Sequence, residues 1–312
     1  PVVDLDIPSR YKTGSKNRSD FDAQANAAVE TALKPIDSYV GLLSKSANAA
    51  MSENDAEQKT LIADCVVDRM DEWASANAIS DLSSQGAQLS MPARVAAIAM
   101  SYAQVRPLAT TDERQARIEF WLAERARNSM VFFDNDAPPK SSQNNLRAWA
   151  ALEAAQVGIL VGDNVMKNWA DASVRLVACT ANADGSLPNE MWRGKLALHY
   201  QIHAVGPLVV SAALLADYSP DLFDTCDQAI LRAARFAVTG AQNPAIVETV
   251  AGIKQSFDAS PDKLKAYECA WLVPLMQNVD APDLQAFASQ FKVLSNSKLG
   301  GKQDLIWSDE AP

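Results

Sequence analysis

The spacing of apolar residues constrains this chain more than any other feature, because it is helical almost throughout. Apolar side chains recur every three to four positions from Val29 to Leu43 and again from Ile62 to Trp73. This spacing places them on one face of an α-helix. No segment of useful length alternates apolar and polar residues as a half-buried strand would. The sequence therefore predicts an all-α fold.

The same spacing predicts further helices along the rest of the chain. Thr110 and Glu113 match a capping box that opens the helix carrying Ile118. The breaks between helices are short turn signals rather than linkers, so we expect one domain over residues 1–312, built of successive antiparallel helical hairpins. The further helices are expected at residues 93–105, 146–161, 164–179, 190–206, 221–238, 246–255, 262–278 and 281–292.

Size and charge narrow the class of protein. A chain of 312 residues, 48% hydrophobic, can bury a large core. Its longest apolar stretch, from Ala204 to Ala216, contains a glycine and a proline and falls short of the roughly 20 residues that cross a bilayer, so no membrane span is expected. The net charge of −10 disfavours nucleic acid as a partner but is compatible with a polyanion in a locally basic cleft. The sequence leaves the oligomeric state open.

Cysteine usage leaves the redox state open. Cys65, Cys179, Cys226 and Cys269 form no CxxC pair and no metal-ligand spacing, so no metal site is expected. Four plain thiols and one or two disulfides both fit this spacing. The chain begins at Pro1, which fits a processed protein whose export signal has been removed, although removal of a tag would give the same start.

The only two histidines lie in one short segment, together with an arginine and a tyrosine. On the helix expected at 190–206, Arg193 and Tyr200 lie two turns apart on one face, and His203 lies one turn beyond Tyr200. A cation beside a phenol lowers its pKa and helps it to act as a base. The His199-x-x-x-His203 pair lacks the intervening glutamate of a metalloprotease, so a zinc site is not expected.

The segment 8–20 does not follow a helical pattern. Its residues from Pro8 to Arg18 include four cations, one aromatic residue and a glycine. This composition fits a mobile lid loop that closes over an acidic ligand. A solvated N-terminal tail is the alternative.

Two adjacent asparagines precede the helix expected at 146–161. An asparagine at this position normally caps the helix, which accounts for one of the pair. The other amide, from Asn144 or Asn145, would then be free to bind a carboxylate or a hydroxyl group.

Taken together, these segments resemble the alginate lyase family, polysaccharide lyases that cut polymannuronate by β-elimination. The resemblance extends from about Ser9 to Trp307. It implies an incomplete α/α toroid around a cleft, an acidic polysaccharide substrate, no metal or organic cofactor, and a periplasmic or secreted location. The segments that carry it are Ser9-Arg-Tyr-Lys12, Arg106-Pro-Leu-Ala109, Arg117-Ile-Glu-Phe-Trp121, Asn144-Asn-x-x-x-Trp149, Gly185-Ser-Leu-Pro-Asn-Glu190, Arg193-Gly-x-x-Ala-Leu-x-Tyr200, Pro207-Leu208, Ala270-Trp-Leu-x-Pro274 and Leu299-Gly-Gly301.

This chain departs from the family at a catalytic position. The family has an Asn-Asn-His triplet followed by an Arg-x6-Tyr arrangement, and here Leu146 stands where the histidine is expected. Arg147 follows it in place of a serine, and His203 replaces a tyrosine one turn past Tyr200. Two readings follow: either His203 and Arg147 take over the lost function on a related substrate, or the site has lost activity.

The resemblance implies a role for each candidate residue. Removing the C5 proton of a uronate requires that its carboxylate be neutralised, which amide and cationic donors can do. We expect Tyr200 to act as base and then acid, with Arg193, Asn145 and His203 as the other catalytic residues. The expected substrate-binding residues are Asn144, Arg147, Trp149, Tyr11, Arg10, Lys12, Lys140 and His199.

Mannuronate-rich alginate is the substrate that the resemblance implies, and a related bacterial exopolysaccharide is an alternative substrate. The replacement of the histidine by Leu146 also leaves open a glucuronan-type lyase. The alternative that is not an enzyme is a catalytically silent polyuronate-binding protein linked to exopolysaccharide synthesis or export.

Overall fold

Helices form most of the structure, a computed structural model that describes residues 1–258 and 263–308. The all-α prediction is confirmed. The α-helices are α1 (Ala23–Ser52), α2 (Ala56–Ser75), α3 (Gln85–Ser90), α4 (Pro92–Val105), α5 (Glu113–Asn135), α6 (Asn145–Val161), α7 (Asn164–Ala178), α8 (Pro188–Met191), α9 (Ala197–Leu214), α10 (Thr225–Gln242), α11 (Pro244–Ala251), α12 (Leu272–Asn278), α13 (Pro282–Ala288) and α14 (Gln303–Ile306).

Short 3-10 helices and two-residue strands complete the described part of the chain. The strands β1 and β2 pair in parallel, and β3 and β4 pair antiparallel. The 3-10 helices are η1 (Ser141–Gln143), η2 (Gly194–Leu196), η3 (Ala266–Cys269) and η4 (Ser297–Leu299), and the strands are β1 (Asp4–Leu5), β2 (Asp81–Leu82), β3 (Ser295–Asn296) and β4 (Gly301–Lys302).

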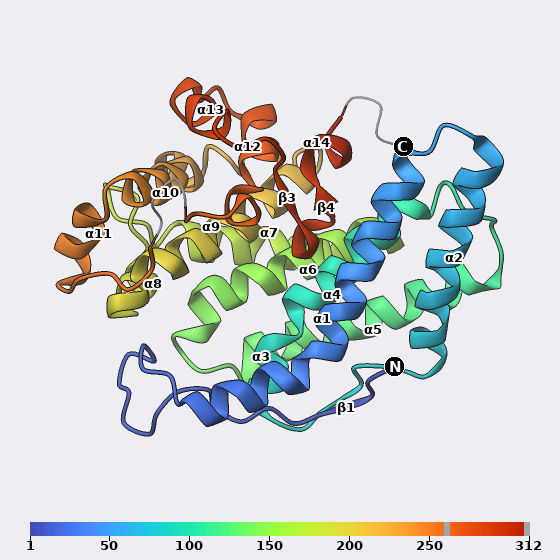
Figure 1. The fold of residues 1–312 in the computed structure, drawn as a ribbon, viewed down its shortest axis with the longest axis horizontal. Helices are drawn as coiled ribbons and strands as arrows, with labels where there is room; N and C mark the ends of the chain where they lie inside the picture. The colour runs from blue at the N-terminus through green and yellow to red at the C-terminus, as the bar shows by residue number, and fades with distance from the viewer. Residues whose placement is uncertain (259–262, 309–312) are drawn as a thin grey trace.

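Helix α6 lies at the centre of the fold and packs against α4, α5, α7 and α9 (Figure 1). Almost every residue from Asn145 to Gly158 is buried, as expected for a helix that is covered on all sides. The helix ends at Gly162, which takes a φ of +69° that favours glycine, and Asp163 then caps α7. This tight connection makes α6 and α7 an antiparallel hairpin. The first turn of α6, which begins at Asn145, lies at the end of the helix away from this connection.

Helix α9 is the second buried element. The stretch Gly194–Leu214 is long and apolar enough to cross a membrane by length and composition, but 78% of it is buried inside the protein. It packs against α6, α7, α10 and α12, as a core helix does.

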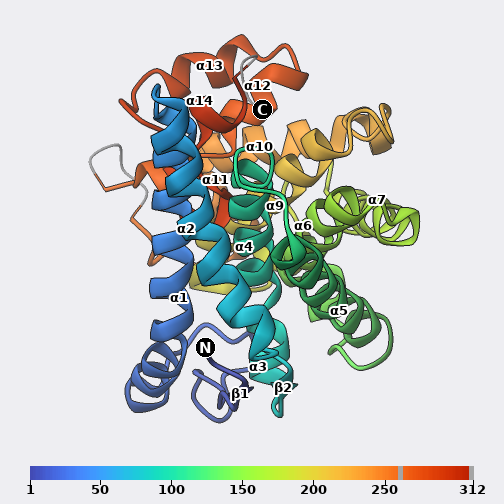
Figure 2. The same cartoon turned by 90° about the vertical axis from the view of Figure 1, so that its right-hand side faces the viewer.

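The C-terminal segment returns to the N-terminal half of the chain. In both views α12 to α14 lie at the top and β1 lies toward the bottom (Figures 1 and 2), while η4 and β4 contact α1 and α4. One hydrophobic cluster extends from Leu5 to Leu299 through the described residues.

The helix expected at 190–206 is interrupted, so that prediction is wrong. Helix α8 ends at Met191, Arg193 lies in the turn that follows, and α9 begins only at Ala197. Gly194 takes a φ of +58°, which breaks the helical path, and a Cβ atom there would lie 2.5 Å from the Asn17 side chain. Arg193 and Tyr200 therefore do not share a continuous helix.

The capping box expected at Thr110 is also wrong. Asp112 caps α5 by accepting a hydrogen bond from the backbone N–H of Arg114, whereas the Thr110 hydroxyl donates to Asp64. The aspartate lies one residue before the helix, where a side-chain oxygen reaches the free N–H groups best.

Helix bounds near the C-terminus differ from the sequence expectations. Helices α11 and α13 end four residues earlier than expected, and residue 262 lies outside the described residues. The helix expected at 262–278 is divided into η3 and α12. In contrast, α4, α6 and α7 match the expected bounds to within one residue. Asn144 and Gly162 mark the two ends of α6, and Asp163 marks the start of α7.

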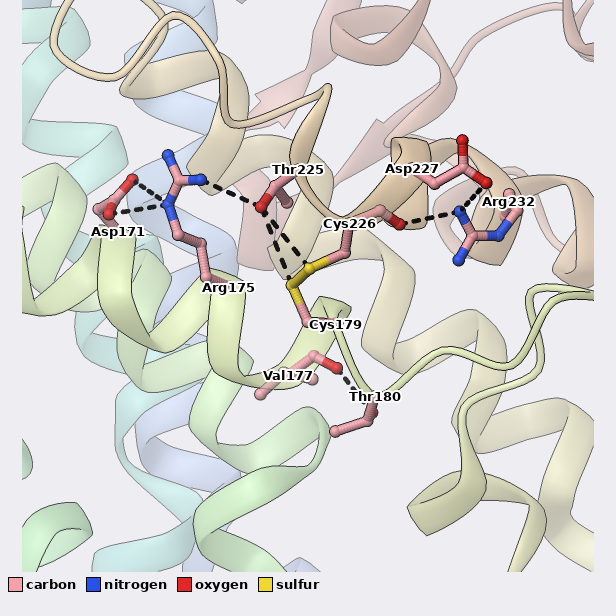
Figure 3. The surroundings of a disulfide bond; sticks show 9 residues. All are labelled: Asp171, Arg175, Val177, Cys179, Thr180, Thr225, Cys226, Asp227 and Arg232. Carbon is pink, nitrogen blue, oxygen red and sulfur yellow. Dashed lines mark hydrogen bonds and ion pairs between the residues drawn. A yellow bond between two sulfur atoms is a disulfide. The ribbon is translucent and has the colours of Figure 1, made fainter.

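A disulfide joins Cys179, at the end of α7, to Cys226, at the start of α10. Figure 3 shows Arg175 beside it, paired with Asp171 and donating to Thr225. Cys65 is an exposed thiol and Cys269 a buried one. Of the arrangements that the sequence left open, the structure has one disulfide and two free thiols among these four cysteines.

Candidate active site

A cleft of about 1580 Å³ opens where the N-terminal loop, α1, α4, α6, α9 and η4 converge. This volume exceeds the roughly 300–1,000 Å³ of a typical small-molecule pocket. The cleft is therefore large enough for an extended ligand.

The cleft is strongly cationic although the chain as a whole is acidic. Only two carboxylates, Glu30 and Asp37, line it among the described residues. A groove with one sign of charge concentrates ligands of the opposite sign. A locally basic cleft of this kind suits a polyanion. The cations that line it are Arg10, Arg18, Lys34, Arg94, Lys140, Arg193 and Lys298.

Two phenols and a guanidinium meet inside the cleft. The hydroxyls of Tyr11 and Tyr200 lie 2.8 Å apart, and Arg193 donates a hydrogen bond to the Tyr11 hydroxyl, also at 2.8 Å. The Arg193 guanidinium carbon lies 3.6 Å from the centre of the Tyr200 ring. Although the helix predicted to join Arg193 and Tyr200 is interrupted, the turn still brings the two groups together.

Arg193 also anchors the N-terminal loop. It donates to the backbone carbonyls of Asn17 and Arg18, and Lys195 pairs with Asp20 at 2.7 Å. No carboxylate pairs with the Arg193 guanidinium in the part of the chain that the structure describes. The loop predicted as a lid is thus bound over the turn that carries Arg193, and its Arg10, Tyr11 and Arg18 line the cleft.

The pKa of Tyr200 is raised above that of a free phenol. Burial raises it, and the charge of Arg193 lowers it by a smaller amount. Burial also lowers the pKa of His203 well below its ordinary value, which leaves the imidazole neutral. The Arg193 charge thus acts on Tyr200 in the expected direction, but the pKa of the phenol is raised overall because desolvation outweighs that charge. A neutral His203 adds no positive charge.

The paired asparagines divide their roles as expected, with one difference. Asn144 caps α6 by accepting from the backbone N–H of Leu146. Asn145 is not a free amide, because its backbone N–H and its Nδ2 both donate to the carboxylate of Glu190, at 2.7 and 2.9 Å. Its Oδ1 is buried without a partner. Both asparagines line the cleft.

Glu190 is a residue whose role in the site was not foreseen from the sequence. Burial raises its pKa to about 7, although the two hydrogen bonds from Asn145 and the charge of Arg193 act in the opposite direction. Glu190 lies on α8, and by accepting both hydrogen bonds it fixes the orientation of Asn145 on α6. The one sequence feature that could have pointed to Glu190 is its position in the segment Gly185 to Glu190, which carries part of the family resemblance.

Arg147 does not belong to the cleft, which corrects its assignment as a substrate-binding residue. Its guanidinium donates to Ser173 and to the carbonyl of Phe133, and it pairs with Asp134 at 2.8 Å. Two residues after Asn145 on a helix, its side chain points to another face, toward α5 and α7. Lys12 is likewise exposed on the loop and does not line the cleft.

Trp149 lines the cleft, but most of its side chain is buried against His203. Its indole N–H donates to His203 Nε2 at 3.0 Å, and only 4% of its surface is exposed. Because Nε2 accepts this bond, the proton of the neutral imidazole lies on Nδ1. The His199 ring stacks 6.1 Å from His203 and also faces the cleft.

Trp192 is the exposed tryptophan of the cleft, and the sequence did not single it out. It is 37% exposed, and the ammonium of Lys140 lies 4.5 Å from its ring centre. An exposed aromatic face beside a cation suits the ring and the carboxylate of an acidic sugar. Lys140 is exposed and lines the cleft, as expected.

Several solved structures similar to this one are of an alginate lyase. Alginate lyase A1-III from Sphingomonas species A1 matches with a TM-score of 0.74 and 22% identity, over 98% of this chain and 83% of that chain. A structure of alginate lyase A1-III complexed with tetrasaccharide matches with a TM-score of 0.79 and 21% identity, over the same shares. The fold is the expected incomplete α/α toroid. The likeness is one of fold, and the cleft that this fold surrounds is cationic.

Sequence comparison identifies the family. The family model described as "Alginate lyase" matches residues 6–247. An alginate lyase of Pseudomonas fluorescens is 26% identical over 305 residues, which are 95% of this chain and 80% of that protein. A polysaccharide lyase of Stenotrophomonas maltophilia is 36% identical over 149 residues, but these are only 48% of this chain and 44% of that protein. The chain belongs to the alginate lyase family.

Proposed function

We propose that this protein cleaves a uronate polymer by β-elimination, with Tyr200 as base and then acid. The observation that carries the proposal is the contact of the Tyr200 phenol with both Tyr11 and Arg193 inside a cationic cleft. Mannuronate-rich alginate is the first substrate to consider, because several relatives are named alginate lyases.

In the proposed reaction one proton moves from C5 to O4, the C5–H and C4–O4 bonds break, and the C4=C5 double bond and the O4–H bond form. The Tyr200 phenolate takes the C5 proton, the electrons of the C5–H bond form the C4=C5 double bond, and the C4–O4 bond breaks. The phenol then returns the proton to O4, which leaves as a hydroxyl. One residue can perform both transfers when the proton and the leaving oxygen lie on the same side of the ring.

The phenolate must be stabilised, since burial raises the pKa of Tyr200. Arg193 lowers the pKa of Tyr200, whereas Tyr11 in its present arrangement raises it. Once Tyr200 is ionised, the Tyr11 hydroxyl can only donate to it, and this donated bond is the stabilisation that we assign to Tyr11. Donors preorganised around developing charge typically contribute roughly 3 to 4 kcal/mol each. The Asn145 Nδ2 group already donates one hydrogen to Glu190, and we assign its second hydrogen to the uronate carboxylate.

The presence of Leu146 in place of histidine supports a second candidate substrate. The imidazole of the family triplet is absent from this position, so a glucuronan-type polymer or another bacterial exopolysaccharide with a different donor requirement is the alternative. The same absence, together with the raised pKa of Tyr200, favours a silent polyuronate-binding protein as the non-enzymatic alternative.

We also propose that the protein acts in the periplasm or outside the cell. The disulfide between Cys179 and Cys226 supports this, because disulfides persist in oxidising compartments.

The test is to incubate the protein separately with polymannuronate, polyguluronate and glucuronan and to follow the ultraviolet absorbance of the unsaturated uronate product. We expect absorbance to rise on at least one polymer and to stay flat for Tyr200→Phe. Tyr218→Phe is the matched control, because Tyr218 is an exposed tyrosine outside the cleft whose hydroxyl donates to Asn168. Binding without any rise in absorbance would instead support the silent protein.

A further inference from the structure

Lys298 brings an ammonium group into the cleft without an acidic partner. It lies on η4, is half-buried and lines the cleft. Within residues 1–258 and 263–308, no carboxylate forms an ion pair with it, and no hydrogen bond of its side chain is present. Arg94, its cationic neighbour, is by contrast paired with Asp37 at 2.8 Å.

The backbone that carries Lys298 is fixed by buried amides. The Asn296 side chain accepts from the backbone N–H of Lys298. Two residues on, the carbonyl of Gly300 accepts from Asn48 and from Gln104, at 3.1 and 3.0 Å. Both of these amides are buried and come from α1 and α4, so the position of the lysine is set by the helical core.

The Asn48 side chain also requires a glycine at position 301, in the turn after Lys298. Asn48 accepts from the backbone N–H of Lys302 and thereby clamps both sides of this turn. Gly301 takes a φ of +115°, and a Cβ atom there would overlap the Asn48 side chain. The turn is therefore held in one conformation.

Apart from Asp37, the groups that act on Lys298 are neutral or cationic. His199 and His203 come from α9, Arg94 from α4 and Arg10 from the N-terminal loop, while the charge of Asp37 is already shared with Arg94. Burial and the Arg94 charge lower the pKa of Lys298 to about 8. A desolvated ammonium without a counter-charge is unfavourable, and a bound carboxylate would relieve it.

We propose that Lys298 binds a uronate carboxylate in the cleft and supplies the positive charge that the Leu146 position no longer provides. The proposal rests on the function proposed above and assigns a residue at the same site. Its chemical basis is that His203 is neutral and Arg147 points away, so neither compensates for the missing imidazole. The ligand group is the carboxylate of an acidic sugar, which a point charge such as an ammonium recognises without directional demands.

The experiment compares Lys298→Met, Lys298→Arg and Lys302→Met on the polymer that the wild type cleaves. Lys302 is the matched control, because it is exposed on the same turn and does not line the cleft. We expect kcat/KM to fall at least about tenfold in Lys298→Met, with partial recovery in Lys298→Arg and a change below about twofold in Lys302→Met. Thermal melting checks that each variant is folded.

Two further readouts separate a carboxylate contact from a structural role. Salt should weaken wild-type binding more than it weakens Lys298→Met, since one attractive charge is missing from the variant. In the wild type, kcat/KM should decline as the pH rises through about 8, because the ammonium loses its proton, and Lys298→Met should lack this decline. A folded Lys298→Met with wild-type kcat/KM and wild-type salt dependence would overturn the proposal.

The two proposals can fail separately. If the wild type forms no unsaturated product on any polymer, the lyase proposal fails, and binding of short oligomannuronate is measured by calorimetry instead. Weaker binding by Lys298→Met than by Lys302→Met would still support the carboxylate contact. Equal affinities would overturn it.

Discussion

The hydroxyls of Tyr11 and Tyr200 lie 2.8 Å apart although 189 residues separate them in the chain. Tyr11 also accepts a hydrogen bond from Arg193 and stacks on Phe21, 5.3 Å away. The N-terminal loop therefore does more than cover the cleft. It contributes the hydroxyl that joins the guanidinium to the proposed base.

Tyr11→Phe tests this connection. The variant keeps the ring stacked on Phe21 but loses the bonds to Tyr200 and Arg193. We expect kcat to fall about tenfold to a hundredfold with a smaller change in KM, because the lost bonds stabilise the phenolate rather than the bound polymer. Steady-state kinetics on the cleaved polymer measures this, with Tyr218→Phe as the control. An unchanged kcat would show that Tyr11 does not assist Tyr200.

Leu146→His tests the departure from the family triplet. Leu146 is half-buried in the first turn of α6 and lines the cleft beside Asn145. An imidazole there adds a donor near the substrate carboxylate, so we expect a changed ratio of kcat/KM values among polymannuronate, polyguluronate and glucuronan. Parallel absorbance assays on the three polymers give this ratio. A ratio equal to that of the wild type would mean that this side chain does not face the substrate.

Glu153→Gln tests a buried carboxyl outside the cleft. Glu153 is fully buried, and neither of its oxygens has a partner with hydrogen-bond geometry among the described residues. Burial raises its pKa from 4.5 to about 8, while nearby Ser129 and the Arg125 charge act in the opposite direction. A carboxyl whose pKa is higher in the folded than in the unfolded state stabilises the fold at low pH. That contribution declines above about pH 4.5 and is lost as the pH rises through about 8.

The glutamine variant should lack this decline. We expect it to be more stable than the wild type at about pH 9, by an amount on the order of a few kcal/mol, with the difference shrinking as the pH falls. Urea unfolding at several pH values measures the free energy of unfolding of both proteins. Parallel pH profiles for the two would contradict the prediction.

The Cys179→Ser/Cys226→Ser double variant tests the disulfide. The bond links residues 47 positions apart and so restricts the unfolded chain. We expect its removal to lower the free energy of unfolding by about 2–4 kcal/mol. Denaturant unfolding with and without a reductant measures this, and the reductant should abolish the difference from the wild type. Cys65→Ser, which removes an exposed free thiol, is the control and should leave stability unchanged. A double variant as stable as that control would argue against a stabilising disulfide.

The sequence by itself determined the helices and the chemistry available to the site. The bounds of α4, α6 and α7 were predicted to within one residue, and Asn144 was recognised as one of two possible caps. These features depend on periodicity and on capping over a few neighbouring residues, which is local information. The ordered motifs around Arg193 and Tyr200 carry the resemblance to the alginate lyase family, which implies an acidic sugar polymer as the substrate.

Only the tertiary structure decided which of these groups meet. Gly194 and the loop packed against it placed Arg193 in a turn, and the opposite face of α6 took Arg147 away from the cleft. Lys298 entered the site from the far end of the chain, and burial reversed the expected change in the pKa of Tyr200. Contacts between distant segments, and the desolvation that accompanies them, depend on how the helices pack, and no local pattern encodes that packing.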